Sequence, residues 1–268
     1  MRLFGCFALL CGILAPASAV AQVSNCQAIA HLVPTAKFVR VSTATPDAYS
    51  VEITYVGHST FRITAPDGTT IATDYAGSAG VGPPPDVVTM NHAHSSHWTA
   101  NPDPAIKHVL RGWNPEGGRA EHLLEVGETL IRNVPSDIRR WGGGIEESGN
   151  SIFIFEIAGL CIGHLGHLHQ ELSDSQVAEI GRLDIVFVPI DGGYTMPHAS
   201  MMNVVDRLRA SMAIPMHWFS EFNLSAFVAQ TRDHGLAIDI NADPTITVSL
   251  NTLPDRPTMV ILPRQFGF

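Results

Sequence analysis

Three closely spaced histidines follow a short apolar segment, and this pattern constrains the fold more than any other feature of the sequence. Residues 86–90 (DVVTM) have the character of a buried strand, and His92, His94 and His97 come directly after it. In an extended chain, residues two apart point to the same side, and a turn would return His97 to the same point. Neutral imidazole is a common metal ligand. We therefore expect strands that end at a metal site.

Two further groups of histidines also follow predicted strands. His164, His167 and His169 come at the end of residues 160–163, and His217 ends the apolar segment 213–216. Functional groups are often carried by loops at the ends of scaffold strands. The three groups together therefore predict a single site that is assembled from several strand ends.

The rest of the chain has the spacing of a strand-rich domain with a few helices. A capping-box pattern, Ser173 with Gln176, opens a helix that Gly181 ends. We expect an α+β domain over residues 48–268, preceded by a lead-in segment at 22–47 and built as a layered sandwich. Helices are expected at 173–181, 201–210 and 225–234, and strands at 51–56, 61–64, 69–74, 86–90, 129–134, 151–157, 160–163, 184–189, 213–216, 245–250 and 259–262. The glycines at 142–144 are expected in a mobile loop at the rim of the site.

Composition excludes several classes of protein. Hydrophobic residues make up 45% of the chain, too many for a mainly disordered protein. The formal net charge of −9 argues against nucleic acid as a partner. The single long apolar run, residues 3–15, is short for a membrane span and is followed by small residues at 17–21. We expect a signal peptide at 1–21, a periplasmic or secreted mature protein and no stable membrane span; an uncleaved anchor is the alternative.

Four cysteines are present, and two of them lie within the expected signal peptide. Cys26 and Cys161 remain as an even pair, which in an oxidising compartment can form a disulfide. The alternative is that Cys161, which lies in an apolar run, is a buried small side chain with a free thiol. The sequence does not decide between the two.

Six ordered motifs within about residues 50–220 resemble the metallo-β-lactamase superfamily. They are 55–61 (YVGHSTF), 73–74 (TD), 91–97 (NHAHSSH), 150–151 (NS), 164–166 (HLG) and 214–217 (IPMH). The resemblance is to the branch that includes ascorbate-6-phosphate lactonase-like enzymes and N-acylphosphatidylethanolamine phospholipase D. It implies a four-layer αβ/βα sandwich and a hydrolase that uses metal-bound hydroxide on an ester, lactone or phosphodiester bond.

The metal ligands implied by the resemblance are altered in this chain. Ser96 and Ser136 stand where the family has an Asp and usually a His, and His167 stands where it has the bridging Asp. The metal ligands carried over are His92, His94, His97 and His217, with His167 at a ligand position. Because two direct ligands and the bridge are changed, we expect one ion. Zinc is favoured, although imidazole also accepts iron, manganese, copper or nickel.

Neutral ligands leave the full charge of the ion at the site, which favours a small-molecule substrate with an anionic group. Loss of the carboxylates leaves open which group acts as the base. Asp191 is favoured as the base, and His58, His169 and Asp137 are the alternatives. His58 and Asp74 can also orient ligand imidazoles.

Two other functions remain open: a metal- or ligand-binding protein with a degenerate site, and a metal-dependent oxidoreductase. Trp98, Trp141 and Trp218 either line an apolar pocket or pack in the core.

Overall fold

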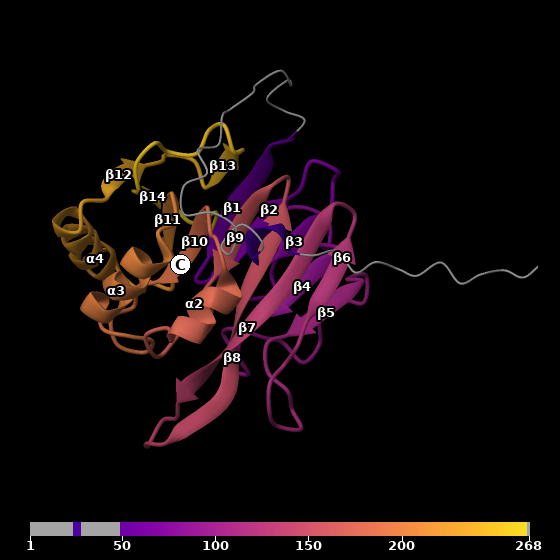
Figure 1. The fold of residues 1–268 in the computed structure, drawn as a ribbon. Coiled ribbons are helices and arrows are strands. Elements are labelled where there is room, and N and C mark those ends of the chain that lie inside the picture. The colour runs from indigo at the N-terminus through magenta and orange to yellow at the C-terminus, as the bar shows by residue number, and fades with distance from the viewer. Residues whose placement is uncertain (1–23, 28–48, 267–268) are drawn as a thin grey trace, which may run out of the picture.

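Two mixed β-sheets face each other in the computed structural model, which describes residues 24–27 and 49–266 (Figure 1). The expected signal peptide and most of the lead-in segment lie outside these residues. The six-stranded sheet has the order β13 (Thr245–Val248), β1 (Val51–Gly57), β2 (Thr60–Thr64), β3 (Thr70–Ala72), β4 (Val87–Met90) and β5 (His108–Arg111). The eight-stranded sheet has the order β12 (Ala237–Ile240), β14 (Thr258–Ile261), β11 (Met212–Met216), β10 (Ile185–Pro189), β9 (Leu160–His164), β8 (Ile145–Ile157), β7 (Thr129–Arg139) and β6 (Leu123–Val126).

The hydrophobic core lies between the two sheets. Phe61 of β2 stacks on Phe187 of β10 with ring centroids 3.9 Å apart, and Tyr55 of β1 stacks on Phe61 at 4.8 Å. All three side chains are fully buried. Burying side chains of this size stabilises a fold by roughly 1.5–3 kcal/mol each. The stack therefore helps to hold β1 and β2 of one sheet against β10 of the other.

Three helices pack on the eight-stranded sheet. Helix α2 (Asp174–Ile180) contacts β7, α3 (His198–Leu208) contacts β10 and α4 (Glu221–Asp233) contacts β12. Strand β10 is a continuous apolar run that is buried at every position, as expected for a parallel strand covered on both faces. None of the described helices has the length and apolar character needed to span a bilayer.

A disulfide links Cys26 to Cys161 in β9, with the Cα atoms 5.9 Å apart. The disulfide alternative is therefore confirmed over the free thiol. Next to it, the buried carboxylate of Glu156 accepts hydrogen bonds from the Ser24 hydroxyl and the Asn25 backbone N–H, at 2.5 and 2.9 Å. The described part of the lead-in segment is thus attached to the core.

The α+β class is confirmed, and most predicted elements are present with shifted ends. Helices α3 and α4 begin three and four residues before the predicted starts, because Ser220 caps α4 and Pro197 precedes α3. Strands β5, β6 and β12 were not predicted. The glycine segment 142–144 is the turn of the β7–β8 hairpin, which projects at the bottom of Figure 1. All three glycines have φ between 90° and 101°, which only glycine adopts freely.

A candidate metal centre of histidines

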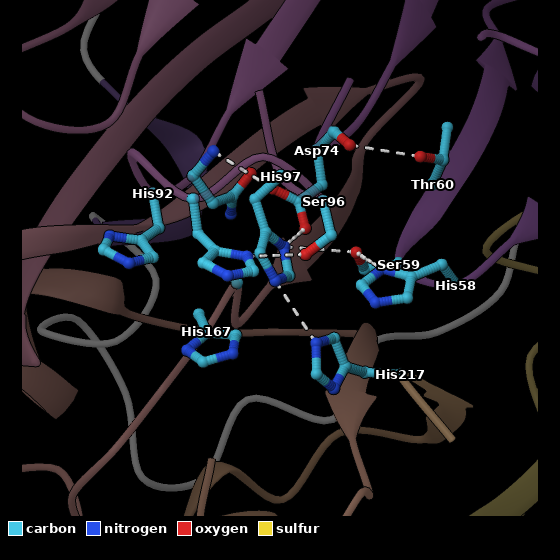
Figure 2. A network of polar contacts seen from close by, with 12 residues as sticks. His58, Ser59, Thr60, Asp74, His92, Ser96, His97, His167 and His217 are labelled. Atoms are coloured by element: carbon cyan, nitrogen blue, oxygen red, sulfur yellow. Dashed lines mark hydrogen bonds and ion pairs between the residues drawn. The ribbon is translucent and has the colours of Figure 1, made fainter. Parts of the chain in front are cut away.

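Loops at the strand ends bring the five predicted ligands together with a sixth histidine, His58. The His97 ring centroid lies 4.7 Å from that of His167, 5.1 Å from His217 and 5.1 Å from His58. His92 is further away, at 6.4 Å from His97. In the view of Figure 2, His58 and His167 lie on opposite sides of the His97–His217 pair. The predicted convergence of the three histidine groups is therefore present in the structure.

A β-bulge and three residues with left-handed backbone conformation direct side chains into the site. His58 follows a register shift between β1 and β2, and a β-bulge of this kind redirects the next side chain. His58, Asp74 and His217 have φ of 51°, 49° and 56°, a left-handed conformation that His and Asp enter more readily than most residues. The His217 backbone N–H donates to the His58 carbonyl at 2.6 Å. This bond joins the end of β11 to the end of β1.

His97 and His217 are each held by a buried carboxylate. His97 Nδ1 contacts Asp74 Oδ2, and His217 Nδ1 lies 3.0 Å from Asp191 Oδ2. Asp74 also accepts a hydrogen bond from the Asn91 backbone N–H, and as a carboxylate it is the acceptor toward His97. Each imidazole therefore carries its proton on Nδ1 and leaves a lone pair on Nε2.

The two Nε2 atoms face each other at a distance of 3.2 Å. Two lone pairs at this distance repel, so a cation or a shared proton must separate them. Nitrogen ligands about 2.0–2.1 Å from a tetrahedral zinc ion lie about 3.3 Å from one another. The residues present therefore fit a metal ion held by His97 and His217, with Asp74 and Asp191 orienting the ligands from behind.

His58 is close to this pair. Among the residues that the structure describes, the donor atoms of His58, His97 and His217 form a group within 4.8 Å of one another. Burial, followed by the neighbouring His217 and His97, lowers the pKa of His58 to about 3, and burial lowers the pKa of His97 well below its usual value. Both rings are therefore neutral near pH 7.

His167 belongs to a different hydrogen-bonded chain. The Arg139 backbone N–H donates to His169 Nδ1 at 2.9 Å, and His169 Nε2 lies 2.6 Å from His167 Nδ1. Burial lowers the pKa of His169 to about 4 and lowers the pKa of His167. The structure thus brings His169, a predicted catalytic candidate, against His167 rather than into the His97–His217 pair.

The remaining histidines near the site have separate partners. His92 Nδ1 donates to the Gly149 carbonyl at 2.8 Å, and exposed His94 Nδ1 lies 2.9 Å from the Ser96 hydroxyl. His164 is fully buried, with Nε2 2.8 Å from the Ser59 carbonyl. Because Asn91 and Gly166 donate to its other nitrogen, His164 is a packed core residue.

Asp191 lies at the site, but all its acceptor positions are in use. Its oxygens accept hydrogen bonds from His217 Nδ1, from the Gly193 backbone N–H and from both the backbone and the hydroxyl of Thr195. Burial raises the pKa of Asp191, but the hydrogen bonds from His217 and Thr195 outweigh it and lower the pKa overall. This arrangement suits orientation of His217 better than proton transfer to a substrate.

The other predicted positions lie beside the centre. Asp137 accepts a hydrogen bond from the Ser148 backbone N–H within the hairpin, at 2.9 Å. Buried Ser136 accepts from Asn150 Nδ2 at 2.8 Å, so it does not replace the ligand that is usual at this position. Among the three tryptophans, Trp98 packs on Trp113 and Trp141 is 96% exposed at the hairpin tip.

Sequence reasoning missed an aromatic wall and an open pocket next to the centre. The partly exposed Phe219 ring lies 5.2 Å from His217 and 5.5 Å from Tyr194. The guanidinium carbon of Arg264 lies 3.9 Å from the centroid of the Trp218 ring. Arg264 also lines a pocket together with His58. Thr60, Ser78 and Ser96 also line this pocket. Phe219 and Thr60 lie within two residues of His217 and His58 in the sequence, whereas Tyr194, Ser78 and Arg264 are distant from both and had no such signal.

Comparisons with known proteins identify the family of this chain. Residues 52–217 match the family described as the beta-lactamase superfamily domain. A metal-dependent hydrolase of Methanoregula boonei is 24% identical over 182 residues, covering 63% of this chain and 82% of the relative. A Thermotoga maritima structure named as a candidate Zn-dependent hydrolase of the metallo-β-lactamase superfamily has 27% identity and a TM-score of 0.57, covering 79% of this chain and 98% of that chain.

One structural neighbour has a different chemistry. CmlA, a diiron β-hydroxylase from Streptomyces venezuelae, is 14% identical with a TM-score of 0.52, and the match covers 75% of this chain and 54% of that protein. At this identity the likeness shows the fold alone, so the fold does not by itself decide the reaction. The family match, the sandwich of two mixed sheets and the cluster of histidines at the strand ends agree, and the protein belongs to the metallo-β-lactamase superfamily, among relatives named metal-dependent hydrolases.

Proposed function

We propose that this protein is a hydrolase that binds one metal ion between His97 and His217, with zinc as the favoured metal. The hydrolase cleaves an ester, lactone or phosphodiester bond. The observation that carries the proposal is the 3.2 Å separation of two Nε2 atoms whose Nδ1 atoms are both held by carboxylates. The family match and the names of the relatives support hydrolysis as the reaction. Zinc is supported by the nitrogen donors, which suit a four-coordinate site with one open position.

Each residue of the pair has a defined task in this proposal. A bound divalent ion supplies Lewis acidity and acidifies a coordinated water. Asp74 and Asp191 hold the two rings in the tautomer that presents Nε2, and they fix the ring planes. Because Asp191 is saturated with hydrogen bonds, it serves as a positioning residue and not as the general base.

The surroundings of the centre support a substrate with both an anionic and an apolar part. Asp74 and Asp191 offset part of the charge of an ion, so the ion alone does not account for a preference for anions. Arg264 lines the pocket beside His58 together with hydroxyl groups, and guanidinium pairs well with carboxylate or phosphate. Phe219 and Tyr194 offer an aromatic wall to an acyl or aryl group.

We also propose that the protein is exported to the periplasm or the exterior. The apolar run at residues 3–15 and the small residues at 17–21 support export. The Cys26–Cys161 disulfide is consistent with an oxidising compartment.

The proposed reaction is tested by metal reconstitution and a substrate panel. Metal-free protein is loaded with zinc, manganese, iron, copper or nickel and assayed on p-nitrophenyl esters, lactones and bis(p-nitrophenyl) phosphate. We expect hydrolysis of at least one class that requires metal and is lost in His217→Ala. A protein that binds no metal, or one whose hydrolysis is unchanged in His217→Ala, would refute the proposal.

A further inference from the structure

The metal centre needs a third protein ligand, and the family resemblance and the structure point to different residues for it. In the family pattern, carboxylates at positions 96 and 167 would complete the coordination of the ion at His97 and His217. This chain has Ser96 and His167 there. The structure offers two imidazoles, His58 and His167, on opposite sides of the pair. Their hydrogen bonds distinguish them.

His58 lies against both members of the pair, with its ring centroid 5.1 Å from that of His97 and 4.3 Å from that of His217. Its Nδ1 lies 2.8 Å from the Ser59 hydroxyl oxygen, which also lies 3.4 Å from His97 Nδ1. When the Ser59 oxygen accepts the Nδ1–H of His58, Nε2 of the neutral ring is unprotonated. The donor atoms of His58, His97 and His217 lie within 4.8 Å of one another. In this tautomer His58 has the same arrangement as His97 and His217: an oxygen acceptor holds Nδ1, and Nε2 is available to a metal.

His167 has the opposite tautomer. The Arg139 backbone N–H can only donate, so His169 Nδ1 accepts its hydrogen bond. A neutral His169 then carries its proton on Nε2 and donates it to His167 Nδ1 at 2.6 Å. With Nδ1 accepting, neutral His167 carries its proton on Nε2. This nitrogen is a hydrogen-bond donor and has no lone pair for a metal.

We propose that one metal ion is held by His58, His97 and His217, and that His167, at the position of the bridging carboxylate, is a hydrogen-bond donor and not a ligand. His58 therefore replaces the carboxylate that is absent at position 96. Three neutral nitrogen ligands leave the fourth tetrahedral position open for water or substrate. His92 and His94 lie outside the ligand set because, among the described residues, the donor atoms that gather within 4.8 Å of one another belong to His58, His97 and His217. The His92 and His94 ring centroids lie 6.4 and 6.0 Å from that of His97. The inference rests on the proposed metal site.

The test is zinc affinity, measured by competition with a chromophoric chelator, in matched histidine-to-asparagine variants. Asparagine removes the ligand nitrogen and tolerates the left-handed backbone at position 58. We expect His58→Asn to weaken zinc binding by more than about 100-fold, beyond the effect usual for an outer partner of a ligand. His92→Asn and His167→Asn should stay within about threefold, because neither removes a ligand. Circular dichroism of the metal-free variants checks that they fold.

A second variant tests the replacement itself. Adding Ser96→Asp to His58→Asn returns a carboxylate to the family position and should recover at least about tenfold in affinity. The inference is overturned if His58→Asn binds zinc as tightly as the unmodified protein, if His167→Asn loses as much affinity as His58→Asn, or if Ser96→Asp gives no recovery. Unmodified protein that binds no zinc would instead refute the proposed function, so the two failures are distinguishable.

Discussion

Removing the Cys26–Cys161 disulfide should cost much of the stability of this fold. The bond closes a loop with a sequence separation of 135, for which the loss of chain entropy in the unfolded state corresponds to about 5 kcal/mol at 25 °C. Native disulfides typically contribute about 2–5 kcal/mol when removed. We therefore expect Cys26→Ala with Cys161→Ala to lower the free energy of unfolding by about 2–5 kcal/mol. Both side chains are buried, so alanine leaves small cavities. Arg182 Nη2 loses its contact with Cys161 Sγ but keeps its hydrogen bond to the Gly159 carbonyl.

The assay is urea unfolding at equilibrium, followed by tryptophan fluorescence. The control is the single variant Cys26→Ala, which loses the cross-link but keeps the Cys161 side chain and so separates packing from cross-linking. Zinc content should remain unchanged, because neither cysteine contacts the histidine cluster through the bonds described above. If the double variant unfolds within about 1 kcal/mol of the unmodified protein, the entropic account of this cross-link is wrong.

Three further predictions follow from the site and the sequence. Asp191→Asn should weaken zinc binding about 10–100-fold through loss of the charged partner of His217; unchanged affinity in a chelator competition would remove Asp191 from its orienting role. The pKa of His58 is about 3 in the folded protein and about 6.5 in the unfolded chain. The unfolded chain thus binds more protons below pH 6.5, and the Tm of metal-free protein should fall as the pH is lowered from 7 to 4; a Tm that rises would contradict this. Export should yield a mature N-terminus near Val20 or Gln22, and an intact mass that includes Met1 in the exported fraction would argue against cleavage.

Much of the fold could be predicted because its strands carry a strong local pattern. The apolar run at β10 and the alternation in β1 are visible in the sequence. Strand β6 and the first half of β8 are not visible in the sequence, because β6 is only partly buried and residues 145–149 are mostly polar. They form because hairpin pairing with β7 extends across them, and such pairing leaves no hydrophobic period to detect.

The site could be predicted as a cluster but not as a set of roles. The position of His92, His97 and His217 after apolar strands indicated that they converge. The assignment of His167 as a ligand followed from its place in a motif, whereas its tautomer depends on His169 and on a backbone N–H of another strand. Similarly, Asp191 was favoured as a base because it follows a strand, and the Thr195 contacts that occupy its oxygens depend on the folded loop.

The most direct test of the central claim is anomalous diffraction at the zinc edge from crystals of zinc-loaded protein. The account predicts a single peak between His97 and His217, within about 2.0–2.1 Å of both Nε2 atoms and of His58 Nε2. Two peaks of similar height, or one peak bound by His92 and His94 and away from His217, would contradict it.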